Sequence, residues 1–496
     1  MMVPPHVPGP AIALDDTVRR RTWAELGERT TRIARFLREE AGLGPGEHIA
    51  VFMGNRVEFV EVVLGAILAG LWVTPINRHL TREEVAYVLK DSGARLVFVD
   101  PERAALAAAT VARERLVEAG PALEVAVAGA SADPVPSEWP PGGTMIYTSG
   151  TTGRPKGVKR ARPATVAAAF ERMRQAGARL GLNGRGPHLV TGPLYHAAPL
   201  LFAIYDLVAG APMVIMPRWD ERRFLALVAE HGVRHTHLVP TMFVRLLRLP
   251  EAERKAFDPS PLELVLHGAA PIAESVKRRM IDWWGPILVE YWGATESGYC
   301  TLVDSAEWLA HPGTVGRATE QFEVFAVDES GRRLPPGRPG LLYCRHRHMD
   351  RPFEYHNDPD KTAAAYLGPG TFTLGDMGWV DEEGYVYLTD RKSNMIISGG
   401  VNVYPAEIEL VLQQHPAVLD ACVFGVPDEE WGESVKAAVE LAPGWQPSEQ
   451  LAAEILAFAR EHLASYKVPR SLVFERELPR HPSGKIITRL VRQRYL

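Results

Sequence analysis

The chain has 496 residues, of which 46% are hydrophobic, so it is long enough to bury large cores and is expected to form more than one domain. Its formal net charge of -5 shows no basic excess, which argues against a nucleic-acid partner or an anionic membrane surface. Cys300, Cys344 and Cys422 lie far apart without a CxxC pair, so a disulfide framework is excluded and a reducing, cytoplasmic location fits best.

The start of the chain and its most apolar run are the two places where a targeting or membrane segment could lie. Residues 1–13 are proline-rich and lack the basic and apolar regions of a secretory signal, so they are expected to be irregular. The uncharged run 62–77 is shorter than the roughly 18 to 20 residues of a membrane span and contains Gly65, Gly70 and Pro75. It predicts a buried helix followed by a strand, and no membrane span.

Two capping boxes mark helix starts early in the chain. The pairs Thr22–Glu25 and Thr81–Glu84 each place a hydroxyl and a carboxylate where they satisfy the free amides of a first helical turn. Each predicted helix is followed by a continuous apolar run, 49–53 and 96–99, which is typical of strands buried on both faces. This alternation predicts a largely parallel α/β sheet.

The α/β pattern continues with strands at 213–216 and 262–267 and a helix at 224–231. From Phe322 onward, short strands interrupted by glycine and proline predict a β-rich subdomain.

A charged turn at residues 390–394 separates this β-rich region from a new α+β run that ends at Leu496. We therefore place a domain boundary there. The large N-terminal domain is expected to cover residues 1–390 and the small C-terminal domain residues 391–496.

A loop that follows Met145 and Ile146 combines hydroxyls, glycines and a lysine. Glycines let backbone amides form an anion-binding concavity, hydroxyls donate hydrogen bonds and Lys156 adds a positive charge, so the loop suits a polyphosphate. Its spacing is not that of a Walker A loop. Composition alone supports an ordinary surface loop as well as it supports a phosphate-binding loop. The residues are Tyr147, Thr148, Ser149, Gly150, Thr151, Thr152, Gly153, Arg154, Pro155, Lys156 and Gly157.

Three later motifs have chemical uses as well as ordinary structural ones. In segment 290–297, Glu296 can hold Mg²⁺ against phosphate oxygens and the ring of Tyr291 can stack on adenine, although such aromatic pairs usually belong to a core. Segment 267–271 follows a strand, where open α/β sheets bind ligands, but it is also a tight turn. Asp376 beside Gly375 offers a hydrogen-bond acceptor, but the dipeptide alone is typical of a turn.

Taken in order along the chain, these motifs closely resemble those of the adenylate-forming superfamily of acyl-CoA synthetases, luciferases and peptide-synthetase adenylation domains. The resemblance extends from about residue 22 to residue 485. It implies layered α/β subdomains plus a β-rich subdomain, followed by a small, mobile α+β domain. It also implies ATP and Mg²⁺ as cofactors, coenzyme A (CoA) as co-substrate, and two half-reactions that meet at an acyl-AMP.

The resemblance assigns a role to individual residues. Lys485, in the loop 482–486, is expected to stabilise the charge that develops during adenylation. Glu296 is the expected magnesium ligand, and Asp376 is expected to bind the ribose hydroxyls. The catalytic group comprises Lys485, Glu296, Thr151 and His196. The nucleotide-binding group comprises Thr148, Ser149, Gly150, Thr152, Gly153, Lys156, Gly268, Ala269, Ala270, Tyr291, Trp292, Gly293, Thr295, Asp376 and Arg391.

The remaining assignments concern movement and thiol transfer. Asp390 is similar to the family hinge, and Ser398, Gly399 and Gly400 are similar to the loop that lines the thiol tunnel after the small domain rotates. Many family members have x-Lys-Asp after the hinge arginine. This chain has Ser393 and Asn394, so no role is transferred to those two positions.

Segments 277–298 and 353–409 are most similar to bacterial fatty-acyl and bile-acid CoA ligases, which implies a hydrophobic carboxylic acid. The acceptor stays open between CoA, a carrier-protein thiol, an amine and the activation of nitrite. A non-catalytic nucleotide-binding regulator is the alternative from another class, although it is disfavoured because Lys485, Glu296 and Asp376 are present. The oligomeric state also stays open, and a homodimer is compatible with the sequence.

His235 and His237 flank Thr236 and could suggest a metal, but no third ligand follows at a regular spacing. A zinc site is therefore not expected.

Overall fold

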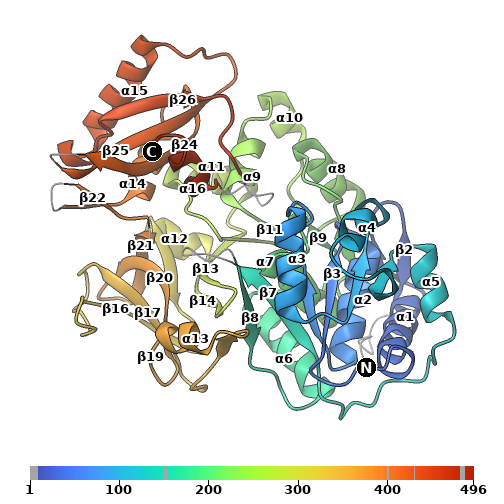
Figure 1. Cartoon of the computed structure of the whole chain (residues 1–496). Coiled ribbons are helices and arrows are strands. Elements are labelled where there is room, and N and C mark those ends of the chain that lie inside the picture. The colour runs from blue at the N-terminus through green and yellow to red at the C-terminus, as the bar shows by residue number, and fades with distance from the viewer. Residues whose placement is uncertain (1–8, 149–154, 392–393, 399–400, 429–430, 481–485) are drawn as a thin grey trace.

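The computed structural model describes residues 9–148, 155–391, 394–398, 401–428, 431–480 and 486–496. Within these residues the strands form three sheets (Figure 1). The first two draw on interleaved segments of the large N-terminal part, and the third lies in the C-terminal part. The expected α/β class, with a large N-terminal part and a small C-terminal part, is confirmed.

The first sheet has seven strands in the order β18-β8-β7-β4-β3-β5-β6. The strands are β3 (His48–Phe52), β4 (Trp72–Pro75), β5 (Leu96–Val99), β6 (Leu116–Glu118), β7 (Gly143–Thr148), β8 (Lys156–Arg160) and β18 (Phe353–Tyr355). The helices of this region are α1 (Trp23–Arg35), η1 (Phe36–Glu40), α2 (Val57–Leu68), α3 (Arg82–Ser92), α4 (Pro101–Ala108), η2 (Arg113–Arg115), α5 (Pro121–Ala128) and α6 (Val166–Arg179).

The helix starts and buried strands that the sequence predicts here are confirmed. Thr22 and Thr81 both form complete capping boxes, with Glu25 and Glu84 respectively. The apolar run 62–77 becomes the end of α2 and strand β4, and every residue of α2 is buried. No helix in the described part of the chain is both long and apolar enough to cross a bilayer.

The second sheet is the largest, with 14 strands in the described residues. Its main path is β16-β17-β20-β21-β15-β14-β13-β12-β11-β9-β10-β1-β2, and β19 pairs with β20. The strands are β1 (Ile12–Asp15), β2 (Arg20–Thr22), β9 (His188–Val190), β10 (Met213–Ile215), β11 (His235–Leu238), β12 (Leu264–His267), β13 (Leu288–Ala294), β14 (Gly298–Val303), β15 (Thr314–Ala318), β16 (Phe322–Val327), β17 (Gly340–His346), β19 (Tyr366–Gly368), β20 (Thr371–Val380) and β21 (Tyr385–Arg391).

In this sheet β1, β9, β10, β11, β12 and β13 pair with one another in parallel. The β1–β2 pair is antiparallel, and so are the pairs that join β13 to β17 and β19 to β21. This change of pattern is the predicted β-rich subdomain. The helices are α7 (Ala197–Ala209), α8 (Glu221–His231), α9 (Pro240–Leu247), α10 (Glu251–Ala256), α11 (Glu274–Trp284), α12 (Ser305–Ala310) and α13 (Pro359–Ala365). One hydrophobic core, which includes residues of α1, α2 and α7, joins this sheet to the first.

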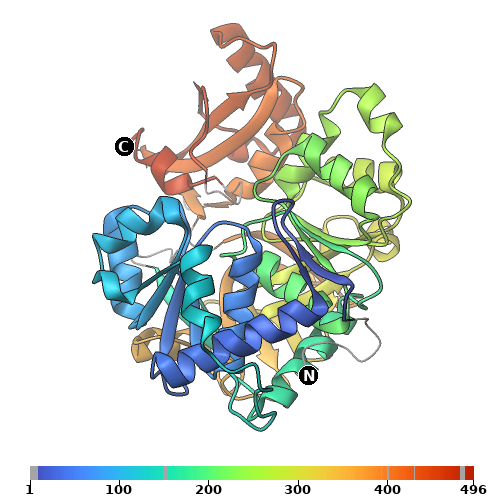
Figure 2. The same cartoon turned by 90° about the vertical axis from the view of Figure 1, so that its right-hand side faces the viewer.

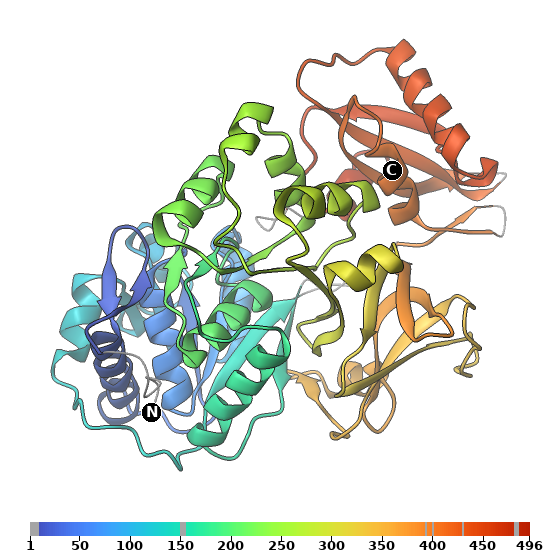
Figure 3. The same ribbon diagram turned by 180° about the vertical axis from the view of Figure 1, so that it is seen from behind.

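The third sheet belongs to the C-terminal part, which stands as a separate lobe in Figures 2 and 3. Its strands are β22 (Ile396–Ser398), β23 (Val401–Val403), β24 (Val418–Asp428), β25 (Gly432–Leu441) and β26 (Ser471–Glu475). Its helices are α14 (Pro405–Leu412), α15 (Glu449–His462), η3 (Ser465–Lys467) and α16 (Thr488–Arg492). A hydrophobic core of its own, drawn from β24, β25, α14 and α15, holds the lobe together.

Two sequence expectations are wrong in detail. Ile12 and Ala13 are not part of an irregular leader, because they lie in β1, which pairs with both β2 and β10. Asp390 and Arg391 are not in a turn, because they are the last residues of β21 and lie opposite Met377 and Asp376 of β20. In both cases cross-strand pairing, which the local composition does not reveal, extends a strand into a polar or proline-rich segment.

Candidate active site

The β7–β8 hairpin carries the predicted phosphate loop. Thr148 and Lys156 lie opposite each other at its end, where β7 and β8 pair in antiparallel fashion. Ser149, Gly150, Thr151, Thr152 and Gly153 fall outside the described residues. The hairpin therefore fixes both ends of the loop, and it places Lys156 at the end of the strand that pairs with β18.

Tyr355, at the end of β18, brings Lys156 and Glu296 together. The Lys156 ammonium nitrogen lies 4.5 Å from the centroid of the Tyr355 ring. The Tyr355 hydroxyl donates a hydrogen bond of 3.0 Å to Glu296 Oε1. Burial and the neighbouring Glu296 charge raise the pKa of Tyr355 well above its ordinary value, so the hydroxyl keeps its proton. Lys156 and Glu296, which come from distant segments, therefore both contact the side chain of Tyr355.

The predicted ribose residue, Asp376, is paired with the segment that carries Glu296. Asp376 is buried in β20, and its Oδ2 accepts a hydrogen bond of 2.8 Å from the indole nitrogen of Trp292. Trp292 and Gly293 belong to β13, and Thr295 and Glu296 lie in the turn that joins β13 to β14. Arg391 lies opposite Asp376 in the β20–β21 register. The predicted nucleotide residues of β13 and β20 are therefore neighbours.

Tyr291 and Trp292 face opposite sides of β13, because side chains alternate along a strand. The Tyr291 ring packs edge-on against Phe202 of α7, with 5.1 Å between the ring centroids, and its hydroxyl lies 3.0 Å from His237 Nε2. Burial raises the pKa of Tyr291 and lowers the pKa of His237 to about 3, so both side chains are neutral. The aromatic ring that faces Asp376 is that of Trp292.

The loop after β12 carries Gly268, Ala269 and Ala270 beside β13. A Cβ atom on Gly268 would lie 2.5 Å from the Tyr291 carbonyl oxygen and 2.9 Å from its ring, so only glycine fits. Ala269 has φ = 67°, a left-handed conformation that costs a residue with a Cβ atom roughly 1 to 2 kcal/mol. Such backbone strain persists where the surrounding structure imposes it, often at ligand sites.

His196 is the N-cap residue of α7, and its ring lies 4.8 Å from that of Tyr195. The helix that follows is attached to the sheet by Asp206, whose Oδ2 lies 2.7 Å from His235 Nδ1 and 3.1 Å from His188 Nδ1. These two hydrogen bonds outweigh burial and lower the pKa of Asp206 to about 2. Of the two histidines considered for a metal site, His235 holds the Asp206 carboxylate together with His188, and His237 pairs with Tyr291.

The predicted hinge and thiol residues are only partly described. Asp390 and Arg391 end β21, and Ser398 ends β22 in the C-terminal lobe. Gly399, Gly400 and Lys485 lie outside the described residues. The described residues that bound the lysine loop, Arg480 and Ile486, form an antiparallel bridge.

Sequence reasoning missed Tyr355, Asp206 and the pairing of His237 with Tyr291. The one available signal for Tyr355 was its place in a segment already singled out for its resemblance to acyl-CoA ligases. A tyrosine at the end of a short strand gives no other sign of a functional role. Its contact with Glu296 depends on β18 joining β8, a pairing between strands almost 200 residues apart that local patterns do not encode.

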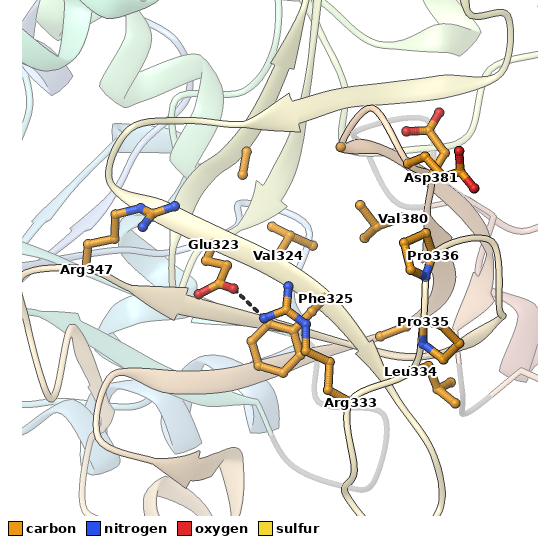
Figure 4. Close-up of a pocket in the computed structure, with 14 residues that line it drawn as sticks. Glu323, Val324, Phe325, Arg333, Leu334, Pro335, Pro336, Arg347, Val380 and Asp381 are labelled. Atoms are coloured by element: carbon orange, nitrogen blue, oxygen red, sulfur yellow. Dashed lines mark hydrogen bonds and ion pairs between the residues drawn. The ribbon is translucent and has the colours of Figure 1, made fainter.

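A hollow of about 260 Å³ in the β-rich region is separate from these residues (Figure 4). It is lined by parts of β16, the 333–336 segment and the end of β20. Arg333 lies across its mouth, 2.5 Å from Glu323 and 4.8 Å from the centroid of the Phe325 ring. None of the predicted site residues lines it.

Comparison with known proteins also identifies an AMP-binding enzyme, over most of the chain. A family model described as AMP-binding enzyme matches residues 6–351, and one described as AMP-binding enzyme C-terminal domain matches residues 407–485. A fatty acid–[acyl-carrier-protein] ligase of Streptomyces coeruleorubidus is 35% identical, over 96% of this chain and 92% of that protein. A long-chain-fatty-acid–CoA ligase of Mycobacterium tuberculosis is 33% identical, over 96% of this chain and 93% of the other.

Among solved structures, the o-succinylbenzoate CoA synthetase of Bacillus subtilis in complex with its acyl-adenylate intermediate is similar, with a TM-score of 0.82. It is 26% identical in sequence, and the match covers 97% of this chain and 95% of that one.

Proposed function

The chain belongs to the AMP-binding enzyme family, and on that premise we propose that it activates a hydrophobic carboxylic acid with ATP and transfers the acyl group to CoA. Membership of this family implies the adenylate-forming reaction class. The acid, the thiol acceptor and the roles of single residues are the parts that we propose. The observation that carries the proposal is the convergence of Lys156, Glu296 and Tyr355, three residues from distant segments.

In the first half-reaction an acid oxygen attacks the α-phosphate of ATP, forming acyl-AMP and releasing pyrophosphate. We assign the phosphates to the 149–154 loop and Lys156, whose ammonium is held over Tyr355 beside the Glu296 carboxylate. A single carboxylate is a suitable protein ligand for Mg²⁺, which keeps most of its remaining coordination for water and phosphate oxygens. Glu296 would hold the ion, which would neutralise charge on the phosphates.

We assign the nucleoside to residues that lie next to β13. Asp376 would accept hydrogen bonds from the ribose hydroxyls, and the Gly268–Ala270 loop would border the adenine. Trp292 orients the Asp376 carboxylate through its indole N–H. Because Trp292, and not Tyr291, faces Asp376, we assign the aromatic contact with the nucleoside to Trp292.

In the second half-reaction a thiol attacks the acyl carbonyl and AMP leaves. The resemblance places Ser398, Gly399 and Gly400 along the thiol path and gives His196 the position where acid, phosphate and thiol meet. A carrier-protein thiol is the second candidate acceptor, because the Streptomyces relative is named as a ligase for acyl-carrier protein.

The proposal is tested by acid-dependent pyrophosphate release with fatty, aromatic and alicyclic acids. Each acid is incubated with and without CoA, with an acyl-carrier protein, and in separate reactions with nitrite plus an arylamine. We expect release with at least one hydrophobic acid and formation of its CoA thioester. A protein that binds ATP but releases no pyrophosphate with any acid or with nitrite would be a regulator instead.

Tyr355→Phe is expected to raise the KM for MgATP by roughly 10- to 150-fold, because Glu296 loses a hydrogen bond of the charged type, worth about 1.5 to 3 kcal/mol. Steady-state kinetics with the acid saturating would measure the change. Tyr366→Phe is the matched control, since the Tyr366 hydroxyl donates to the Phe353 carbonyl and not to Glu296. Equal effects of the two substitutions would contradict the link between Tyr355 and the metal site.

Asp376→Ala is expected to weaken AMP binding by roughly 10- to 150-fold, which corresponds to the same 1.5 to 3 kcal/mol for lost hydrogen bonds to a charged group. Isothermal titration calorimetry would measure it. Trp292→Phe keeps an aromatic ring but removes the indole donor, so its effect should be smaller. An AMP dissociation constant that stays at the wild-type value in Asp376→Ala would remove this residue from the ribose site.

A further inference from the structure

A lysine with no exposed surface lies behind the predicted adenine loop. Lys277 of α11 is 0% exposed, and its ammonium donates a hydrogen bond of 2.5 Å to Glu290 Oε2 of β13. Glu290 is itself only 4% exposed. Lysine and glutamate are almost never fully buried unless they are paired, so this contact accounts for both side chains being tolerated in the interior.

The surroundings of the pair are mostly apolar. The Lys277 ammonium lies 4.7 Å from the centroid of the Trp308 ring, and His267 Nε2 lies 3.9 Å from Glu290 Oε2. His267 is fully buried, and both burial and the Lys277 charge hold its pKa far below the usual range, so it is neutral. Lys277 and Glu290 are therefore hydrogen-bonded to each other as a charged pair, and the Lys277 charge also interacts with Asp304.

Stability alone is a poor explanation for this arrangement. Removing two charges from water is costly, and replacing a buried ion pair by packed apolar side chains is often neutral or stabilising. In some proteins a buried polar or ionic contact instead fixes the alignment of two elements. The relevant elements here are α11 and β13.

These two elements flank the predicted nucleotide site. Helix α11 follows directly after the loop that contains Gly268, Ala269 and Ala270, and β13 leads into Gly293, Thr295 and Glu296. Strands β12 and β13 are parallel neighbours, with His267 opposite Glu290. The Lys277–Glu290 pair thus joins α11, which follows the 268–270 loop, to β13, which leads into Glu296. The loop contains Ala269, whose φ is strained.

We propose that Lys277 and Glu290 are positioning residues, which hold the 268–270 loop against β13 so that the two segments together accept the nucleotide. The inference rests on the proposed function, because it presumes that this loop borders the adenine. Neither side chain touches the nucleotide. Their effect is on the separation and register of α11 and β13.

The test compares Lys277→Met, Glu290→Gln and the double variant Lys277→Met/Glu290→Leu with the wild type. We expect each single variant to raise the AMP dissociation constant at least about tenfold, while the KM for the acid at saturating ATP stays unchanged. The double variant should recover the wild-type Tm, since no unpaired charge remains, but should keep the weakened AMP binding. This separation of Tm from affinity is the result that simple packing would not produce.

Glu61→Gln is the matched control. Glu61 is fully buried in α2 and paired with Arg21 and Arg29 at 2.8 and 2.7 Å, outside the predicted nucleotide site. It should lower Tm without changing AMP affinity. The inference is overturned if the folded variants bind AMP within about twofold of wild type, or if the double variant recovers both properties. A wild-type protein that neither binds AMP nor releases pyrophosphate would instead contradict the proposed function.

Discussion

Lys485→Ala is expected to lower the rate of acyl-adenylate formation by about 100- to 1000-fold, the usual loss when one contact to charge developing in a transition state is removed. Attack of a carboxylate on the α-phosphate increases the negative charge that a positioned ammonium stabilises. Single-turnover measurement of acyl-AMP from acid and ATP would determine the loss. Thiol transfer from preformed acyl-AMP should be much less impaired, because that step has no phosphoryl attack to stabilise.

The structure supports a positioned lysine through the residues that bound its loop. Arg480 forms ion pairs of 2.6 Å with Asp420 and 2.9 Å with Glu440, and so ties the start of the loop to β24 and β25. The antiparallel bridge between Arg480 and Ile486 then closes the loop at its base. The described residues on either side of the segment that contains Lys485 are therefore fixed on the C-terminal sheet.

Lys255→Ala is a suitable control, because Lys255 lies on helix α10, where its side chain pairs with Glu251 of the same helix. It should leave both half-reactions unchanged. If Lys485→Ala slowed adenylation and thiol transfer equally, the lysine would not be specific to the first step.

Much of the fold follows from local sequence patterns, since capping boxes and apolar periodicity act over a few residues. Thr22 and Thr81 begin helices because each hydroxyl satisfies an amide three residues later, which is visible in four letters of sequence. The extension of β21 through Arg391 depends instead on pairing with β20, and a charged pentapeptide gives no sign of it.

The candidate site likewise has residues that local motifs identify and residues whose contacts depend on pairing between distant segments. The order of motifs identifies Glu296 and Asp376 as candidates, but the sequence does not say which neighbours hold them. Strand alternation turns Trp292 toward Asp376 and Tyr291 toward His237, so a correct placement of β13 was needed to separate two adjacent aromatic residues. Lys277 is harder still, because a lysine in an amphipathic helix is normally read as exposed.

The last prediction concerns the connection between the lobes. Asp390→Pro is expected to retain acyl-AMP formation while losing most thiol transfer, because proline fixes φ near about -65° and removes a backbone donor at the proposed pivot. Asp390 is the penultimate residue of β21, and the next described residues lead into β22 of the C-terminal lobe. If the lobe rotates as proposed, the connection between β21 and β22 would absorb the rotation.

The reason for an unequal effect lies in the two arrangements that the half-reactions require. By the proposed assignments, the first needs Lys485 at the nucleotide and the second needs residues 398–400 there, so one rigid orientation would serve only one step. Contacts such as the hydrogen bond of 3.1 Å from Arg248 to the Leu419 carbonyl have to break when the lobe turns. That bond is exposed and costs little to lose.

Asp390→Ala keeps the backbone donor and free φ, so it separates the loss of rotation from the loss of the carboxylate. Rapid-quench measurement of acyl-AMP formation and of its reaction with CoA in both variants would provide the comparison. Pro also perturbs the pairing of Asp390 with Met377, next to Asp376, so AMP affinity is measured in parallel. If Asp390→Pro binds AMP normally and its acyl-AMP still reacts with CoA at the wild-type rate, rotation about Asp390 does not gate the second step.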